Sequence, residues 1–278
     1  MSHIEPAPAK INLALHVLGR RADGYHELDS IVAFAGIADR LTFEKADDWH
    51  LAITGPFAAE LDSAPDNLVL KAARGFAEVF GAQGRYRISL EKHLPVASGI
   101  GGGSADAAAT LRALRSLSGG TIDSGKLSTL AASLGADVPV CLVGRSCRMR
   151  GIGERIDLLP DLAPMPAVLV NPRREVATAQ VFAKLALRPG DKGFAGLEEG
   201  VDLASCRNDL APPALAVAPV IGEVIAALTG QAGLRFARMS GSGATCFGVF
   251  TSSAAAEAAA RDIAAANPGW WVMPTVIG

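Results

Sequence analysis

The sequence predicts an α+β protein of two domains, and three observations lead to this prediction. The chain has 278 residues, which is long for one simple core and sufficient for two packed units. Half of the residues are hydrophobic and 19% are charged, as in a globular chain. Segments of period two alternate with segments of helical period, so strands and helices are mixed. We place the boundary in a stretch rich in Pro and Leu, giving domains 1–158 and 159–278.

The first domain is expected to begin with strands. Residues 11–17 alternate strictly between two faces, which is the period of a strand. The turn residues Asp23-Gly24 allow residues 25–34 to return as the second strand of a hairpin. Further strands are expected at residues 39–44, 49–54 and 86–92.

Helices are expected in the rest of the first domain. Residues 68–80 carry apolar positions at helical spacing, and Asp66-Asn67 supplies an N-cap. Residues 105–117 and 126–134 show the same spacing, and glycines follow both segments. The short apolar run at residues 140–143 is predicted to be a strand.

The second domain mixes four strands with three helices. The strands are predicted at residues 167–170, 236–240, 245–250 and 270–274, and the helices at residues 175–187, 214–228 and 254–266. Residues 188–207 are rich in loops. The order strand–helix–helix–strand–strand–helix–strand is typical of a small α+β sandwich with its helices on one face.

Composition and charge narrow the classes of function. The formal net charge is −2 and the arginines are scattered, so no nucleic-acid partner is expected. Apolar runs stay shorter than about 20 residues and the first ten residues do not form a signal peptide, so neither a membrane span nor secretion is expected. The four cysteines show no metal-binding spacing, and we expect reduced thiols in a cytoplasmic protein.

The strongest local signal is the segment 95–106, which reads PVASGIGGGSAD. Four glycines within five residues allow positive φ angles and a close approach of backbone to a ligand. A helix follows directly, and its first amides and its dipole favour an anion. A glycine-rich turn that only caps the helix is the alternative.

The spacing of this segment excludes two common phosphate-binding loops. It lacks the Gly-Lys-Ser/Thr ending of a Walker loop, and it does not match G-x-G-x-x-G. Ser104 offers a hydroxyl to a phosphate or to magnesium, or it is the N-cap of the helix. A second turn of small residues, Ser240 to Ala244, is weak alone, but together with the first it suggests a second wall of a phosphate pocket.

Taken in order, these segments resemble the three motifs of the GHMP kinases. The resemblance extends through Ala9 to Leu13, residues 19–28 with Asp-Gly-Tyr-His, Asn67-Leu68 and Gly135 to Pro139, so it covers nearly the whole chain. It implies an N-terminal ATP-binding α/β domain and a C-terminal ferredoxin-like sandwich. One departure concerns Ala97, where the family usually has glycine, and this puts in doubt any role that needs positive φ there. Ala105 also replaces a second serine.

The resemblance implies a site for ATP with Mg²⁺ and a pair of catalytic residues. The implied ATP-binding residues are Asn67, near the adenine, together with Pro95, Val96, Ala97, Ser98, Gly99, Ile100, Gly101, Gly102, Gly103, Ser104 and Ala105. Asp137 is implied as the base that accepts the proton of the acceptor hydroxyl, and Lys10 as its partner. A turn aspartate between helix and strand and an exposed strand lysine are the alternatives. For Asn67 the alternative is a helix N-cap.

The resemblance also implies an acceptor that carries a cytidine diphosphate group. Tyr25 and Phe182 are implied as the stacking pair for its base, and His26 as the reader of the base edge. Asn12 shares a strand face with Lys10, and Thr178 lies one helical turn before Phe182. Without the resemblance, Phe182 is a core residue, and His26 and Asn12 are surface residues.

Several functions remain open from the sequence. The expected one is phosphorylation of a cytidine-diphosphate alcohol by ATP in non-mevalonate isoprenoid synthesis. A kinase for homoserine or mevalonate, a decarboxylase of mevalonate diphosphate and a nucleotide-binding regulator without catalysis are the alternatives. We expect a monomer or weak homodimer.

Overall fold

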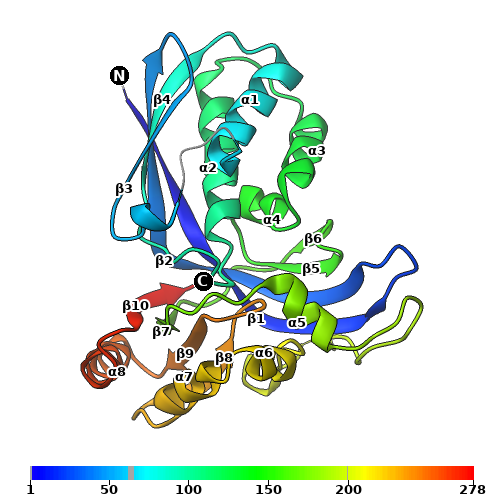
Figure 1. The fold of residues 1–278 in the computed structure, drawn as a ribbon, viewed down its shortest axis with the longest axis vertical. Coiled ribbons are helices and arrows are strands. Elements are labelled where there is room, and N and C mark those ends of the chain that lie inside the picture. Colours follow the sequence, from blue (N-terminus) through cyan, green and yellow to red (C-terminus); the bar gives the residue numbers. More distant parts are fainter. Residues whose placement is uncertain (1, 62–65, 199) are drawn as a thin grey trace. The chain divides into compact units, whose positions relative to one another are not determined.

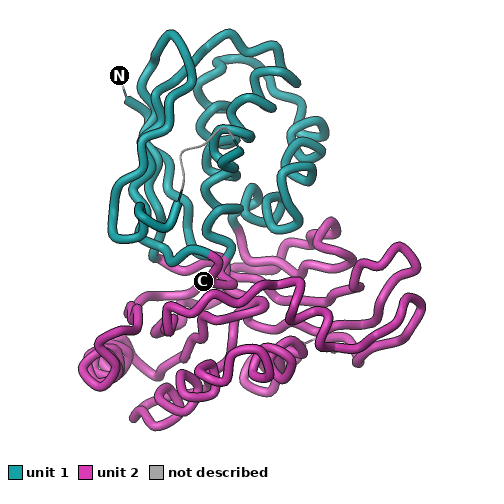
Figure 2. Tube along the Cα trace, viewed as in Figure 1, with its two compact units in different colours: residues 1–9, 37–96, 101–144 teal, residues 10–36, 97–100, 145–278 magenta. Residues whose placement is uncertain are grey.

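The computed structural model describes residues 2–61, 66–198 and 200–278, and the chain forms two compact units. Unit 1 contains Met1–Ala9, Ile37–Val96 and Gly101–Gly144, and unit 2 contains Lys10–Gly36, Ala97–Ile100 and Arg145–Gly278 (Figure 2). The units are therefore interleaved along the chain. The division between residues 158 and 159 concerns continuous segments of sequence and stays a prediction.

Unit 1 places four helices beside a small sheet. Strand β4 (Arg85–Glu91) pairs with the second half of β2 (His26–Ala46) antiparallel and with β3 (His50–Thr54) parallel. A single 3-10 turn, η1 (Ala58–Glu60), follows β3. The helices are α1 (Leu68–Phe80), α2 (Gly102–Leu117), α3 (Ser124–Leu134) and α4 (Val138–Val143), and the other three surround α2 (Figure 1). The many alanines of α2 let these helices approach closely.

Unit 2 contains a hairpin region and a four-stranded antiparallel sheet. In the hairpin, β1 (His3–Arg20) pairs with β2. Strand β2 also pairs with β5 (Cys147–Gly151), and β5 pairs with β6 (Arg155–Leu158). The sheet has the order β10 (Trp271–Ile277), β7 (Met165–Asn171), β9 (Cys246–Phe250) and β8 (Leu234–Met239).

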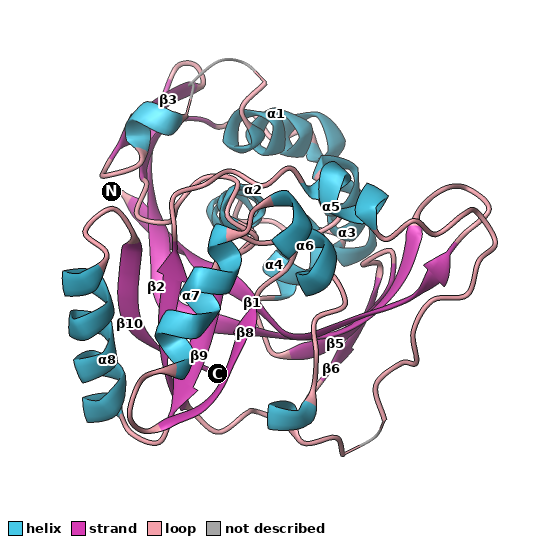
Figure 3. Ribbon diagram, turned by 60° about the horizontal axis from the view of Figure 1, so that its bottom comes forward, coloured by secondary structure: helices cyan, strands magenta, loops and turns pink. Residues whose placement is uncertain are grey.

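The helices of unit 2 cover one face of this sheet. They are α5 (Thr178–Lys184), α6 (Ala211–Val217), α7 (Val220–Thr229) and α8 (Ser253–Ala266), and a 3-10 turn, η2 (Leu203–Ser205), precedes α6. One apolar cluster joins Val168 and Val170 of β7 to Val224 of α7 and Ile263 of α8. Figure 3 shows α7 and α8 beside the strands β8, β9 and β10 of unit 2. Val168 and Val170 are two residues apart, so both helices lie on the same face. The predicted α+β sandwich is confirmed.

Most predicted elements are present, and some of the predictions were wrong. The predicted strand at 140–143 is the helix α4, and the predicted helix at 214–228 is two helices interrupted around Pro219. The strands predicted at 25–34 and 39–44 are one long strand, β2, and neither β5 nor β6 was predicted. Strand β1 is buried on both faces from Ala9 to Leu15, so the alternation of its side chains does not separate a buried face from a solvent-exposed face.

Three further features of the chain concern its cysteines, its hydropathy and an ion pair in unit 2. The four cysteines are buried free thiols. Within the described ranges, helices of sufficient length and hydropathy to cross a bilayer are absent. In unit 2, Asp29 accepts two hydrogen bonds from the Arg148 guanidinium, at 2.8 and 2.7 Å, and one from the amide of Leu197 at 2.9 Å.

Candidate functional site

The glycine-rich turn ends in the N-terminus of α2. The helix begins at Gly102, and Gly101 is its N-cap with a φ of +66°, a left-handed conformation that suits glycine. Ser104 is therefore the third residue of the helix, and its predicted alternative role as N-cap is wrong. The first amides of α2 have no partner within the helix, so this end offers donors that suit an anion, and the phosphate site stays a prediction.

Gly102 and Gly103 serve different purposes. A Cβ at Gly102 would lie 3.2 Å from Nζ of Lys92, so the ammonium leaves no room for a side chain. A Cβ at Gly103 would meet only the Leu68 side chain, at an ordinary 3.6 Å. Packing within unit 1 therefore explains Gly102, whereas the exposed backbone at Gly103 stays accessible to a ligand.

Residues 97–100 belong to unit 2 and contact the second turn of small residues. Ala97 has a φ of +48°, so the position keeps a left-handed conformation without glycine. Gly99 has a φ of +75°, and a Cβ there would lie 2.5 Å from the carbonyl oxygen of Gly243. The Thr245 amide donates to the Ser98 carbonyl at 3.1 Å. The predicted association of the two turns is confirmed, and their role as a phosphate pocket stays a prediction.

Ser240 joins three segments of unit 2 through its hydroxyl. The amide of Asn12 donates to Ser240 Oγ at 3.1 Å, and that hydroxyl donates to the Gly99 carbonyl at 3.2 Å. Asn208 stabilises the turn, because its Nδ2 donates hydrogen bonds to the carbonyls of Met239 and Gly241 at 2.8 and 2.9 Å. Neither Ser240 nor Asn208 was predicted in such a role.

Lys10 and Asn12 are buried at the start of the unit 2 part of β1. Lys10 is only 3% exposed, so the alternative of an exposed strand lysine is wrong. Its amide donates to the Ile100 carbonyl at 2.9 Å, which fixes β1 to the glycine-rich turn. Asn12 donates from Nδ2 to Ser30 Oγ at 2.8 Å, and its Oδ1 is buried without a partner among the described residues. Such an oxygen needs an explanation, and a bound polar group supplies one.

Three of the predicted substrate residues lie on or against α5. The rings of His26 and Phe182 are 4.7 Å apart and tilted by 34°. Burial and the nearby charge of Arg20 lower the pKa of His26, so the imidazole is neutral at neutral pH, and its Nε2 is buried without a partner in the described chain. Thr178 Oγ1 lies 2.9 Å from Ser242 Oγ, which links α5 to the second small-residue turn.

Tyr25 differs from the rest of this set. Its side chain is 61% exposed, and the ring that lies against Phe182 is that of His26. The pairing of Tyr25 with Phe182 around a base therefore stays a prediction.

Asn67 and Asp137 belong to unit 1. Asn67 is the N-cap of α1, since the Val69 amide donates to its Oδ1 at 2.9 Å. This confirms the N-cap without testing a role at adenine. Asp137 is half-buried, directly precedes α4, and accepts at its carbonyl from the Cys141 amide at 3.1 Å. Asp137 precedes a helix and not the predicted strand. Lys10 lies in unit 2, and its catalytic role with Asp137 stays a prediction.

A buried charged cluster in unit 1 was missed by the sequence analysis. Lys92 donates from Nζ to Oδ2 of Asp39 and, at 2.7 Å, to Oδ2 of Asp106. Burial alone would lower the pKa of Lys92, but the two carboxylates outweigh it and raise that pKa. Burial raises the pKa of Asp106 to about 7, despite the attraction of the Lys92 ammonium, and the charge of Asp39 adds to the rise. Hydropathy patterns treat such residues as surface charges, so only the fold identifies the cluster.

Metal-binding chemistry is limited in the described parts of the chain. They contain no group of three or more His, Cys, Asp or Glu side chains placed to hold an ion. The half-buried hydroxyl of Ser104, in the first turn of α2, is an oxygen donor of the kind that Mg²⁺ accepts.

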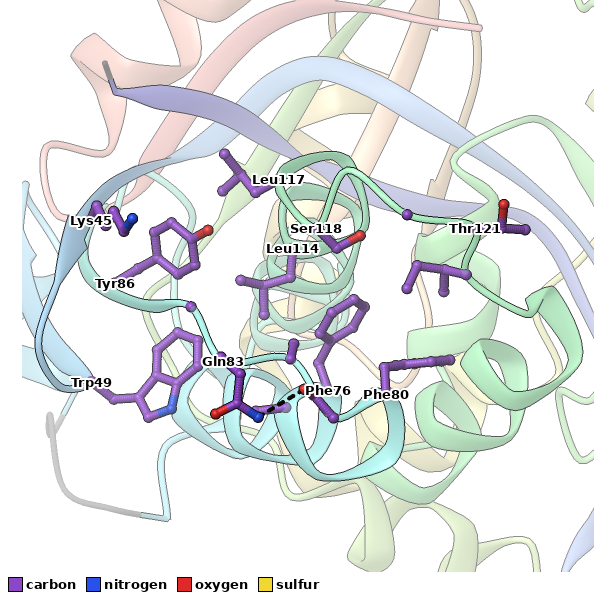
Figure 4. Close-up of a pocket in the computed structure, with 16 residues that line it drawn as sticks. Lys45, Trp49, Phe76, Phe80, Gln83, Tyr86, Leu114, Leu117, Ser118 and Thr121 are labelled. Carbon is purple, nitrogen blue, oxygen red and sulfur yellow. Dashed lines mark hydrogen bonds between the residues drawn. The ribbon is translucent and has the colours of Figure 1, made fainter.

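Unit 1 also contains a cavity of about 470 Å³ that includes none of the predicted site residues (Figure 4). Aromatic and aliphatic side chains line it, among them Trp49, Phe76, Phe80, Tyr86 and Leu114. The rings of Trp49 and Tyr86 are 5.9 Å apart and form one wall. The cavity is at the C-terminal end of α2, opposite the glycine-rich turn.

Comparisons with known proteins agree with this arrangement of motifs. The family model described as GHMP kinases N terminal domain matches residues 67–145, and the one described as GHMP kinases C terminal matches residues 193–269. A 4-diphosphocytidyl-2-C-methyl-D-erythritol kinase of Bradyrhizobium diazoefficiens is 50% identical and covers 97% of this chain and 96% of that relative. The kinase of the same name from Cereibacter sphaeroides is 54% identical, with 96% of each chain covered.

Solved structures give the same result for the fold. A crystal structure of 4-(cytidine 5'-diphospho)-2C-methyl-D-erythritol kinase is 37% identical with a TM-score of 0.84, covering 100% of this chain and 99% of that one. A homoserine kinase from Cytophaga hutchinsonii has a TM-score of 0.73 at 19% identity, covering 99% and 94%, and shows a likeness of fold alone. This chain belongs to the GHMP kinases, within the family of 4-diphosphocytidyl-2-C-methyl-D-erythritol kinases.

Proposed function

We propose that the protein transfers the γ-phosphoryl group of ATP to the 2-hydroxyl of 4-diphosphocytidyl-2-C-methyl-D-erythritol, giving the 2-phosphate and ADP. Similarity over nearly the whole chain to kinases of that name supports this activity. The observation that carries the choice of acceptor is the contact between Phe182 and the half-buried His26, whose pKa is lowered. An aromatic face beside an imidazole with a partnerless Nε2 suits a planar base with a polar edge.

Phosphoryl transfer needs positioning and charge neutralisation more than covalent chemistry. We assign the phosphates of ATP to the first turn of α2, where backbone amides and the positive end of the helix dipole neutralise charge. We assign Asp137 as the base for the acceptor hydroxyl, and the buried ammonium of Lys10 as the group that stabilises the developing negative charge. Asn12 Oδ1 is proposed to accept a hydrogen bond from the acceptor.

Magnesium is proposed to enter with the nucleotide. The phosphates would provide most of its oxygen ligands, with the Ser104 hydroxyl as the proposed protein ligand. When bound, the ion would neutralise charge on the transferred group.

The experiment that tests the proposal is ADP release with a panel of acceptors. Purified protein with ATP and Mg²⁺ is offered 4-diphosphocytidyl-2-C-methyl-D-erythritol, homoserine, mevalonate or galactose at equal concentrations. We expect turnover with the first acceptor alone. Turnover with any of the other three and none with the cytidine compound would refute the proposed substrate.

A further inference from the structure

We propose that the cavity at the C-terminal end of α2 is a binding site for a small planar aromatic anion. The cavity lies within unit 1, and its volume of about 470 Å³ is within the roughly 300–1,000 Å³ of pockets that hold small organic ligands. The described residues that line it include none of the predicted ATP-binding, catalytic or substrate-binding residues. The inference therefore goes beyond the proposed kinase activity and does not depend on it.

Aromatic side chains from the sheet and from a helix line opposite sides of the cavity (Figure 4). On the sheet side, the ring centroids of Trp49 and Tyr86 are 5.9 Å apart. On the helix side, Phe76 and Phe80 are one turn apart on α1, and their ring centroids are 4.8 Å apart. Leu114 of α2 lies between the two pairs. A flat ligand can therefore contact aromatic rings on both sides, in offset or edge-to-face arrangements.

The chain itself holds the sheet side of the cavity in place. The Arg85 guanidinium lies over the Trp49 ring, 5.5 Å from its centroid. Nη1 of Arg85 also donates to the carbonyls of Ala82 and Gly84, at 3.0 and 3.2 Å. A Cβ at Gly84 would lie 3.0 Å from the hydroxyl oxygen of Tyr86, so a side chain there would force this ring to shift. The cavity is therefore formed before a ligand binds, which lowers the entropic cost of binding.

Lys45 determines the charge that the site favours. It is the one charged side chain among the described residues that line the cavity. It is exposed and lies beside Tyr86, its partner across the β2–β4 pair (Figure 4). Gln83 and Ser118 also line the cavity, but their side chains donate to backbone carbonyls of nearby residues, at 3.0 and 2.8 Å. The ammonium is therefore the strongest polar group that the cavity offers to a ligand, and its charge selects an anion.

The carboxylates nearest to this site in sequence do not cancel that selection. Asp47 and Asp48 lie in the bend before Trp49 and are exposed, and the lining of the cavity does not include them. Water and salt screen exposed charges that a ligand does not contact. Because Lys45 is itself exposed, its ammonium contributes a modest part of the affinity, and the aromatic sides of the cavity contribute most of it.

The experiment uses the full chain and two fluorescent ligands that differ in one group. 8-Anilinonaphthalene-1-sulfonate carries an anionic sulfonate, and N-phenyl-1-naphthylamine has the same rings without it. We expect the wild type to bind the sulfonate at a single site. Trp49→Ala is expected to bind both ligands about tenfold more weakly, because it removes one side of the aromatic contact. Phe194→Ala, which removes a 50% exposed ring of unit 2, is the matched control and should bind as the wild type.

Lys45→Met separates the two ligands. We expect this variant to bind the sulfonate about threefold more weakly, which is within the range of an exposed ion pair, and to bind the neutral ligand as the wild type does. Lys71→Met removes an exposed lysine of α1 outside the lining and should leave both affinities unchanged. Equal affinities of the wild type and Lys45→Met for the sulfonate would overturn the selection of an anion.

The position of the bound sulfonate is read from Trp49 itself. The other tryptophans of the sequence are Trp270 and Trp271, so a double variant with Trp270→Phe and Trp271→Phe leaves Trp49 as the only indole emitter. We expect the sulfonate to quench this emission with the dissociation constant found by titration. Unchanged Trp49 emission in the folded variant would overturn the site. Thermal unfolding verifies that each variant is folded, and the Lys45→Met comparison stands if a tryptophan variant does not fold.

Competition separates this site from that of the proposed kinase. Saturating ATP with Mg²⁺, or saturating cytidine diphosphate, should leave the affinity for the sulfonate unchanged, because neither nucleotide is assigned to the cavity. Displacement by either nucleotide, or a wild type that does not bind the sulfonate, overturns the inference. A protein that binds the sulfonate as expected and releases no ADP with any acceptor overturns the proposed function alone.

Discussion

At the scale of single residues, burial separates side chains that look alike in the sequence. Lys10 and Lys92 are almost fully buried, whereas Lys45 and Lys126 are exposed. Burying an ammonium group without partners costs roughly several kcal/mol of folding free energy, so a buried lysine indicates a specific task. For Lys92 the partners are two carboxylates, and for Lys10 the proposed task is at the reacting phosphate.

The proposed base gives the first prediction at this scale. Asp137→Asn is expected to lower kcat at least about a hundredfold, because general-base catalysis contributes about that factor or more. ATP binding should stay within about twofold of the wild type, since the base contacts the acceptor. Turnover by ADP release and binding by calorimetry check both statements. Asp161→Asn, at an exposed position, is the matched control, and near-normal turnover of Asp137→Asn would exclude the role.

Asp29 gives the second prediction, on stability. Burial alone would raise its pKa, but the hydrogen bonds from Arg148 and Leu197 outweigh burial and lower it from 3.8. The stabilisation is therefore present above pH 3.8 and is lost as the pH falls through the lowered value. Asp29→Asn is expected to lower the free energy of unfolding at pH 7 by about 2 kcal/mol.

Urea unfolding at a series of pH values checks this prediction. The difference between wild type and Asp29→Asn should shrink as the solution is made more acidic than the ordinary aspartate pKa. Asp161→Asn removes a carboxylate from an exposed pair with Arg145 and should change the free energy of unfolding by less than about 1 kcal/mol. An equal loss in both variants would contradict the role assigned to Asp29.

At the scale of elements, local signals decided what the sequence predicts well. Helix α1 was predicted to the residue, because Asn67 and Gly81 cap it within the segment itself. Helix α4 was predicted as a strand, because six residues with a short apolar run show no helical period. Strand β5 alternates, with Cys147 and Met149 buried between the half-buried Arg148 and Arg150, but five residues give too short a signal to predict a strand. Strand β6 has four residues without alternation, and its pairing with β5 is not encoded in a local pattern.

The same argument applies to the candidate site. The glycine-rich turn was evident from its own residues, and the roles of Asp137 and Phe182 came from resemblance to a family. The cluster of Asp39, Lys92 and Asp106 joins residues up to 67 positions apart, so it follows only from the packing of three elements. Asn208 and the bridging role of Ser240, itself part of the predicted second turn, were missed for the same reason, since their partners are distant in sequence.

The turn itself gives a prediction at the element scale. Ala97 has a φ of +48°, which costs an L-residue about 1 kcal/mol, so Ala97→Gly is expected to raise the free energy of unfolding by up to about that amount. Chemical denaturation measures the change. Gly119→Ala, at a φ of +64° with nothing within 4 Å, should lose a similar amount. An Ala97→Gly variant less stable than the wild type would show that the left-handed conformation is not strained.

At the scale of the whole molecule, the cysteines give a prediction about reactivity. Burial raises the pKa of Cys147 to about 11 and also raises the pKa of Cys206 and Cys246. The thiolate is the form that reacts with disulfide reagents. At pH 7.5, roughly one unit below the pKa of a free thiol, the native protein should therefore react slowly. In urea, four equivalents should react at once. Glutathione, a free thiol, is the control for the reagent. Rapid reaction of two or more thiol equivalents in the native protein would contradict the burial of these thiols.

The interleaving of the two units has a consequence for synthesis on the ribosome. Residues 10–36 emerge early, yet their strand partners at 147–151 and Ile277 are translated much later. All residues of unit 1 have been synthesised once Gly144 has emerged. In unit 2, by contrast, the early segment 10–36 stays unpaired until the later strands have been synthesised. The nascent chain therefore carries apolar strand segments that wait for their partners, and their protection during translation depends on the order of synthesis as much as on the finished fold.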